Sequence, residues 1–327
     1  MTSLKKALLA TILFLTSVAS ANATYPSPNI AHWDLSVSND RNDPDYQKIR
    51  DMVAKKQFDE AIAILDRKIF DQPREATPEI LKAVILNEKD EPLKALKDLQ
   101  TGFKTERQHP ALHFSFCQIH RKLGNGLTSE KACIIASQQH YQDPLAHYEF
   151  AVTLIAQGKA KEANKEFAYS ARLAPKNSMY PYERGMVFNY LNQNAEAEKS
   201  FKHAFSLNKG NVEAAYQLAY LYATQNDKQQ AESYINHILE NHRDNPKANS
   251  AKLLKDLIYK GSEDKLPLKV NPGQYHLSRS KSLYKSKQYG LCLIEAETAA
   301  RLSPDGLKGQ EILVGLHSMF LRLDMTE

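Results

Sequence analysis

Residues 144–177 read PLAHYEFAVTLIAQGKAKEANKEFAYSARLAPKN, two helix-length amphipathic segments separated by a turn-like Gln-Gly-Lys. The small residue near the middle of this stretch, Ala163, belongs to a series that recurs every 34 positions: Ala61, Ala95, Ser129, Ala163, Ala197 and Ala231. A fixed period of this length, with a small residue kept at one position, is typical of stacked helical hairpins. The sequence therefore predicts a repeat protein in which one two-helix unit is copied along the chain.

Two further positions of the period indicate close helix packing. A tight position lies twelve residues before each small residue and holds Ile49, Ala83, Cys117, Ala151, Gly185 and Ala219. A larger apolar position lies four residues after it and holds Leu65, Leu99, Cys133, Phe167, Phe201 and Ile235. Small residues let antiparallel helices approach, and larger ones fill the seam between them. With 12 glycines in the whole chain and no runs of β-branched residues, we expect an all-α protein.

This pattern resembles the tetratricopeptide repeat family. The match is clearest within residues 144–177, where Ala151, Gly158 and Phe167 stand in family positions. The resemblance covers residues 42–245 as six contiguous units, and residues 273–306 as a looser seventh; the early tryptophan of the family repeat is absent from every unit. The resemblance implies a right-handed superhelical solenoid of antiparallel helix hairpins, which binds other proteins rather than catalysing a reaction.

The N-terminus has the composition of a signal peptide. Lys5 and Lys6 precede an apolar run over residues 7–18, and small residues with an A-x-A pattern follow as far as Ala23. The run is short for a membrane span, so an uncleaved anchor is the less favoured alternative. We expect residues 1–23 to be a signal peptide cleaved near Ala23, and the mature protein to be exported, to a bacterial periplasm.

The remaining segments lie outside the six-unit array. We expect residues 24–41 to be an extended N-terminal segment, residues 246–272 a helix with a basic connector, and residues 307–327 a C-terminal capping helix. From residue 247 to residue 290 there are ten Lys or Arg residues and three acidic ones. This basic stretch is interpreted either as a solvated helix face with a linker, or as a docking patch for an anionic partner or a membrane face. The formal charge of +5 is too small to indicate nucleic-acid binding.

Three cysteines are present, and two of them face each other in the predicted third unit. Cys117 and Cys133 occupy the inward positions of its two helices, so they are the disulfide candidate; the alternative is a pair of small buried residues that stay reduced. His113, Cys117 and His120 share one helix face, which has the shape of a metal site. Because Cys117 is already explained by packing, no metal and no cofactor is predicted.

A column of aromatic residues recurs in the first helix of the units. In tetratricopeptide repeat proteins this position lines the concave groove, where partner peptides or helices bind. The predicted partner-binding residues, taken from this position and the next two turns, are Tyr46, Phe114, Arg121, Tyr148, Val152, Tyr182, Met186, Asn189, Tyr216 and Tyr220. Tyrosine suits such a groove because it offers a large contact area and a hydroxyl group. The alternative is that these side chains pack neighbouring hairpins together.

Four classes of function follow from these patterns. We favour an exported adaptor or scaffold that binds a partner peptide or helix while a cell-envelope complex assembles. A broad-specificity holdase or co-chaperone is the main alternative, and a metal- or haem-handling protein built around His113, Cys117 and His120 is a weaker one. An enzyme is not predicted, because no acid–base pair, phosphate-binding loop or nucleophile motif is present.

Overall fold

The computed structural model describes residues 43–263, 266 and 269–302, and within them there are fifteen α-helices and no strand. The predicted all-α class is confirmed. The predicted signal peptide, the extended segment over 24–41 and the capping helix over 307–327 lie outside the described residues.

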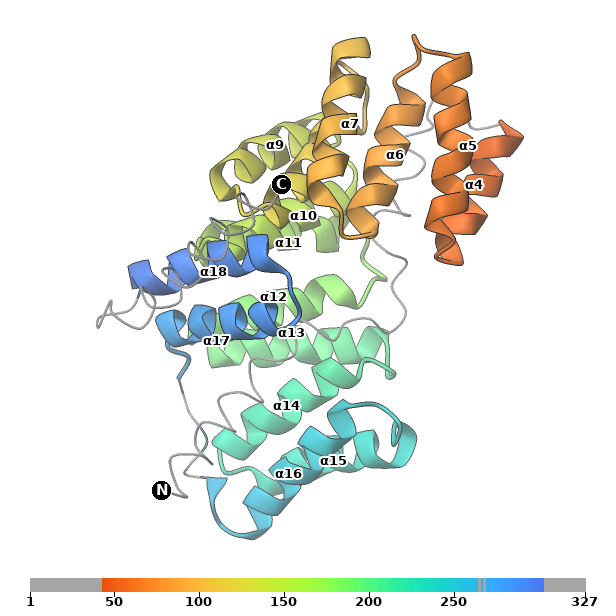
Figure 1. The fold of residues 1–327 in the computed structure, drawn as a ribbon. Coiled ribbons are helices and arrows are strands. Elements are labelled where there is room, and N and C mark those ends of the chain that lie inside the picture. Colours follow the sequence, from red (N-terminus) through yellow and green to blue (C-terminus); the bar gives the residue numbers. More distant parts are fainter. Residues whose placement is uncertain (1–42, 264–265, 267–268, 303–327) are drawn as a thin grey trace.

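Six consecutive helix pairs form a curved stack, which Figure 1 shows from orange to cyan. Each pair falls within one of the units expected from the 34-residue period. The pairs are α4 (Pro44–Ala54) with α5 (Phe58–Asp71), α6 (Thr77–Glu88) with α7 (Pro92–Thr105), α8 (Leu112–Lys122) with α9 (Gly126–Gln139), α10 (Pro144–Ala156) with α11 (Ala160–Leu173), α12 (Met179–Tyr190) with α13 (Asn194–Leu207), and α14 (Val212–Thr224) with α15 (Lys228–Asn241). The described chain is thus a helical-repeat solenoid.

The turn inside each hairpin ends its first helix in the same way. One residue per turn has a left-handed backbone with φ between 58° and 82°, and these residues also recur every 34 positions: Lys56, Asp90, Gly124, Gly158, Asn192 and Asn226. The next amide donates to the carbonyl oxygen five residues back, as from Lys159 N to Leu154 O at 2.9 Å. This arrangement satisfies carbonyl groups that a helix end leaves unpaired. Glycine at positions 124 and 158 adopts it without steric cost.

The seam between paired helices is closed by the residues that the period singles out. All eighteen residues at its three small or apolar positions are buried. Gly185 shows why the tight position needs a small residue, because a Cβ atom there would lie 2.4 Å from Cε1 of Phe201 on the partner helix. Such interdigitation at close-packed density is what holds antiparallel helices together.

The seventh helix pair does not extend the stack. After α16 (Lys247–Tyr259) the chain turns back, and α17 (Pro272–Lys285) and α18 (Tyr289–Leu302) lie beside the middle of the solenoid, as Figure 1 shows in blue. Helix α18 contacts both α8 and α10, which lie far before it in the sequence. We call the α17–α18 pair the returning hairpin.

The returning hairpin meets the carboxyl end of α10 through polar contacts. Thr298 Oγ1 donates a hydrogen bond to Ala156 O at 2.9 Å, and the guanidinium group of Arg301 donates to Gln157 O. The last carbonyl groups of a helix have no partner within the helix and carry a partial negative charge. A hydroxyl group and a cation from the returning hairpin therefore satisfy the end of α10.

Candidate functional site

The ten predicted groove residues all lie on first helices of the hairpins, but the structure divides them by exposure. Three are partly exposed: Arg121, Tyr148 and Val152. Seven are buried: Tyr46, Phe114, Tyr182, Met186, Asn189, Tyr216 and Tyr220.

Several predicted groove tyrosines are buried by contacts within their own hairpin or with a neighbouring one. The Tyr182 ring lies 5.9 Å from the Phe201 ring between centroids, and Lys247 Nζ lies 4.9 Å from the centroid of Tyr216. Only 5 % of Tyr182 and 2 % of Tyr216 is exposed, so a partner could not reach these rings without moving their neighbours. The expectation of one open groove along the whole tyrosine column is therefore corrected, because side chains of adjacent helices cover most of that column.

A cavity remains where the returning hairpin faces the first helices of the third, fourth and fifth units. Its volume is about 340 Å³, and four predicted groove residues contribute to its wall, namely Arg121, Tyr148, Val152 and Met186. The other lining residues are Ile155, Phe167, Glu183, Val187, Tyr190, Tyr275, Arg279, Ser282, Leu283, Gln288 and Leu291. Pockets that bind ligands typically combine an apolar lining of this kind with a few polar groups. We call this space the hairpin cavity.

Tyr190 joins the two walls of the hairpin cavity. Its ring packs edge-on against Tyr275 with centroids 5.1 Å apart, and its hydroxyl oxygen lies 3.1 Å from His276 Nε2. Nearby in the sequence, Asn192 accepts a hydrogen bond from Val270 N at 2.7 Å and donates one to Val270 O at 3.1 Å. Aromatic packing and paired hydrogen bonds thus fix the returning hairpin against α12.

A buried charged network holds the returning hairpin together. Glu295 Oε2 lies 2.6 Å from His276 Nδ1, and Arg279 Nε donates to Glu295 Oε1 at 2.7 Å. Burial alone would raise the pKa of Glu295, but the charge of Arg279 and the hydrogen bond from His276 lower it below its ordinary value of 4.5. A buried ion pair with such hydrogen bonds is costly to break, because the remaining charge is left without a partner.

Two more charged groups, Arg121 and Glu183, line the cavity on the solenoid side. Arg121 Nη2 lies 2.5 Å from Glu149 Oε2, so the guanidinium group is neutralised by its own carboxylate. Glu183 lines the same cavity from α12. Burial raises the pKa of Glu183 to about 7, and the neighbouring charge of Arg279 opposes that rise.

Sequence reasoning missed Glu183, Tyr275 and Arg279. Glu183 directly follows Tyr182 and shares its repeat position with Glu149, 34 residues earlier, while the other two lie in the returning hairpin. The recurrence of an acid at this position could have selected Glu183, whereas no local signal places Tyr275 and Arg279 there.

The comparisons agree with the repeat architecture. A family model described as tetratricopeptide repeat matches residues 191–253. Solved tetratricopeptide-type structures also superimpose on this chain over most of their own length. Residues 191–253 thus match the tetratricopeptide repeat family, and the described chain has the fold of tetratricopeptide-type structures. Proteins of this family are generally non-catalytic scaffolds for interactions between proteins.

Three solved structures illustrate the likeness of fold. PilW, described as a widely conserved type IV pilus biogenesis factor, has a TM-score of 0.57 at 13% identity, covering 63% of this chain and 96% of PilW. PilF of Pseudomonas aeruginosa has a TM-score of 0.54 at 12% identity, covering 69% and 97%. A tetratricopeptide repeat protein of Parabacteroides merdae has a TM-score of 0.50 at 16% identity, covering 74% and 98%. No curated protein matches the sequence significantly.

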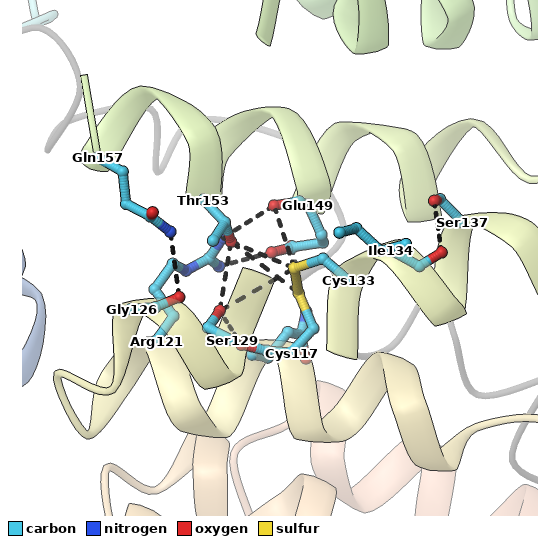
Figure 2. The surroundings of a disulfide bond; sticks show 11 residues. Cys117, Arg121, Gly126, Ser129, Cys133, Ile134, Ser137, Glu149, Thr153 and Gln157 are labelled. Carbon is cyan, nitrogen blue, oxygen red and sulfur yellow. Dashed lines mark hydrogen bonds and ion pairs between the residues drawn. A yellow bond between two sulfur atoms is a disulfide. The ribbon is translucent and has the colours of Figure 1, made fainter. Parts of the chain in front are cut away.

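The third tetratricopeptide repeat carries a disulfide bond between Cys117 on α8 and Cys133 on α9. Figure 2 shows Thr153 and Ser129 beside it, with the guanidinium group of Arg121 directed toward Glu149. Ser129 Oγ donates to Cys117 O at 2.7 Å, so the small position of this repeat also fixes the backbone next to the bridge. The bond joins α9 to α8, and α8 contributes Arg121 to the wall of the hairpin cavity.

Replacing both Cys117 and Cys133 with alanine is expected to lower the free energy of unfolding by about 2–3 kcal/mol, because a short loop is no longer closed in the unfolded chain. Urea unfolding of the two proteins measures this difference. A reducing agent should destabilise the wild-type protein and leave the double variant unchanged. Thiol titration of the denatured, unreduced protein should find the free Cys292 alone, and three thiols per chain would contradict the bond.

The cysteine pairing bears on the alternative metal site. Both Cys117 and Cys133 use their sulfur atoms in the disulfide bond. Within the described residues, no group of three or more His, Cys, Asp or Glu side chains is arranged to hold a metal ion. Burial lowers the pKa of both His113 and His120, which keeps these rings neutral. The alternative metal site at His113, Cys117 and His120 therefore lacks its thiolate ligand, because Cys117 is oxidised.

Part of the basic stretch is neutralised within the protein. Lys247 Nζ lies 2.9 Å from Glu213 Oε2, Lys255 Nζ lies 3.5 Å from Glu232 Oε1, and Arg279 is paired with Glu295. Other lysines of the stretch are exposed, among them Lys252, Lys260, Lys281 and Lys285. No helix in the described parts of the chain has the length and apolar character needed to cross a membrane.

Proposed function

We propose that this protein is an exported, non-catalytic adaptor that holds a segment of another protein during assembly of a cell-envelope complex. The observation that carries the proposal is the hairpin cavity, which lies on the inner side of a tetratricopeptide solenoid and has aromatic and apolar walls. Partly exposed Tyr148 and Val152 contribute to those walls. Tetratricopeptide proteins use their inner surfaces for recognition of other chains, and within the described residues this cavity is a part of that surface that adjacent helices leave open.

The size of the cavity limits what it can hold. About 340 Å³ is near the lower end of the range of binding pockets, which is about 300–1,000 Å³. We therefore propose that a few side chains of a short partner segment enter it, rather than a whole helix. Buried aromatic and apolar contacts at the centre of an interface usually supply most of its affinity.

The location in the cell envelope rests on separate observations. The first 23 residues have the pattern of a signal peptide, and the third repeat holds a disulfide bond, which persists in oxidising compartments. The fold is also similar to that of PilW, a type IV pilus biogenesis factor. We propose that exposed lysines of the basic stretch, such as Lys252 and Lys281, orient the adaptor toward an anionic partner or a membrane face.

Photo-crosslinking in the native cell tests the proposed site. A photoreactive residue at Val152, which lines the hairpin cavity, is expected to give one dominant protein adduct that mass spectrometry identifies. The matched control is the same probe at Lys161, an exposed position on the second helix of the same repeat, and it should not give that adduct.

The pattern of adducts separates the functional classes. Many adducts of similar abundance at Val152 would favour a holdase with broad specificity over an adaptor. Equal adducts at Val152 and Lys161 would overturn the cavity as a binding site.

A further inference from the structure

Three charged side chains line the hairpin cavity, Arg121, Arg279 and Glu183. Arg121 and Arg279 each have their own carboxylate partner, Glu149 at 2.5 Å and Glu295 at 2.7 Å. Glu183 is a further carboxylate in the cavity wall, and no hydrogen bond or ion pair joins it to another side chain within residues 43–263 or 269–302. Both guanidinium groups of the wall are therefore already paired, and Glu183 is the charged residue of the wall that has no ion-pair partner of its own among the described residues.

The same wall is rich in aromatic rings. Tyr148, Tyr190 and Tyr275 all line the cavity, and Phe167 lies beside Tyr148 with ring centroids 5.7 Å apart. The faces of aromatic rings attract cations, and the attraction is stronger where water is excluded. Aromatic rings around a carboxylate form the surroundings in which proteins bind ammonium and guanidinium groups.

The chemistry of the wall distinguishes three kinds of ligand. An anionic side chain would approach guanidinium groups that are already paired, and Glu183 would repel it. A neutral side chain would cover the Glu183 carboxylate without providing a partner, which is unfavourable for a desolvated charge. A cationic side chain would form a charge-assisted hydrogen bond with Glu183, while Val152 and Met186 contact its aliphatic stem.

We propose that the hairpin cavity binds a lysine or arginine side chain of the partner segment, with Glu183 as its counter-ion and Tyr148, Tyr190 and Tyr275 around it. This inference rests on the proposed function, because it names the side chain that the bound segment inserts. Burial raises the pKa of Glu183 to about 7 against the opposing charge of Arg279, and a bound cation would lower this pKa again. The returning hairpin is needed for the site, because Tyr275 comes from it.

Methyl NMR of the full-length processed protein tests the inference directly. Met186 lines the cavity, and its methyl signal is assigned by comparison with a Met186→Leu variant. The probes are three capped pentapeptides, acetyl-Ala-Leu-X-Leu-Ala-amide, in which X is lysine, norleucine or glutamate. The lysine peptide is expected to shift the Met186 signal with a dissociation constant about tenfold lower than that of the norleucine peptide, and the glutamate peptide is expected to bind most weakly.

A second experiment replaces the proposed counter-ion, Glu183. Glu183→Gln keeps the shape of the side chain and removes its charge, so the preference for the lysine peptide should disappear. Glu162→Gln, which removes an exposed carboxylate from α11, should retain the preference.

Each contrary result has a distinct meaning. Equal binding of all three peptides to the wild-type protein would overturn the cationic inference and leave the cavity as a binding site. A preference for lysine that survives Glu183→Gln would overturn the role of Glu183. A Met186 signal that no peptide shifts, together with no specific adduct at Val152, would overturn both the inference and the proposed function.

Discussion

Replacing Glu295 with alanine is expected to lower the free energy of unfolding by about 3–5 kcal/mol. The carboxylate is fully buried and binds both His276 Nδ1 and Arg279 Nε. Without it, the buried guanidinium group of Arg279 loses the carboxylate with which it is paired, which is the reason for the large effect. Urea unfolding monitored by circular dichroism at pH 7 measures the difference. Glu162→Ala, at an exposed position of α11, is the control and should change stability by less than about 0.5 kcal/mol.

The stabilisation that Glu295 provides should depend on pH in one direction. The pKa of Glu295 in the folded chain lies below its ordinary value of 4.5, so its stabilising contribution is fully present above that pH and is lost as the pH falls through the lowered pKa. The difference in stability between the wild-type protein and Glu295→Ala should therefore shrink as the pH falls below about 4. Equal stability of Glu295→Ala and Glu162→Ala at neutral pH would show that the buried network does not hold the returning hairpin together.

The repeat architecture could be predicted because its cause is local and periodic. Ala61, Ser129 and Ala231 are small for the same reason, since each faces a neighbouring helix at the same depth in its hairpin. The left-handed turn residues also follow the period, although their identities range from Lys56 to Gly158, because the turn fixes the backbone conformation rather than the residue type. A signal of this kind is read within one unit and repeated six times.

The returning hairpin could not be predicted, because its contacts join residues far apart in the sequence and occur once. Thr298 meets Ala156 O across 142 positions, and Tyr190 meets His276 across 86. The seventh unit has the same internal pattern as the others, so the pattern alone places it at the end of the stack. Its position depends on complementarity to the helix ends of earlier units, and no period encodes that.

Only part of the candidate site could be predicted, because part of it depends on contacts between distant segments of the chain. Tyr148, Val152 and Arg121 lie on the inner surface, as their column indicates, and they line the cavity. Tyr216 and Tyr220 occupy equivalent columns and are buried, because the helices around them leave no space at that end of the solenoid. The repeat position thus gives the direction of a side chain, while neighbouring elements decide whether a partner can reach it.

Replacing Gly290 with alanine is expected to detach the returning hairpin from the solenoid. A Cβ atom at this position would lie 1.7 Å from Lys122 O and 2.6 Å from Gly124 N. Both are backbone atoms at the end of α8, so no side-chain rotation can relieve the overlap and the hairpin itself must move. The amide of Val270, which donates to Asn192 Oδ1 in the docked state, should then exchange with solvent about 100-fold faster in NMR measurements.

Gly126→Ala is the matched control, because it adds a methyl group to the same interface at ordinary contact distance, 3.6 Å from the side chain of Ile294. It should leave the exchange of Val270 unchanged. The thiol of Cys292, buried between α17 and α18, distinguishes detachment from unfolding, since it should stay unreactive if the hairpin detaches intact. Equal protection of Val270 in the two variants would mean that the hairpin is not docked through Gly290. In that case the cavity would lack its second wall, the returning hairpin, which the proposed counter-ion site at Glu183 requires.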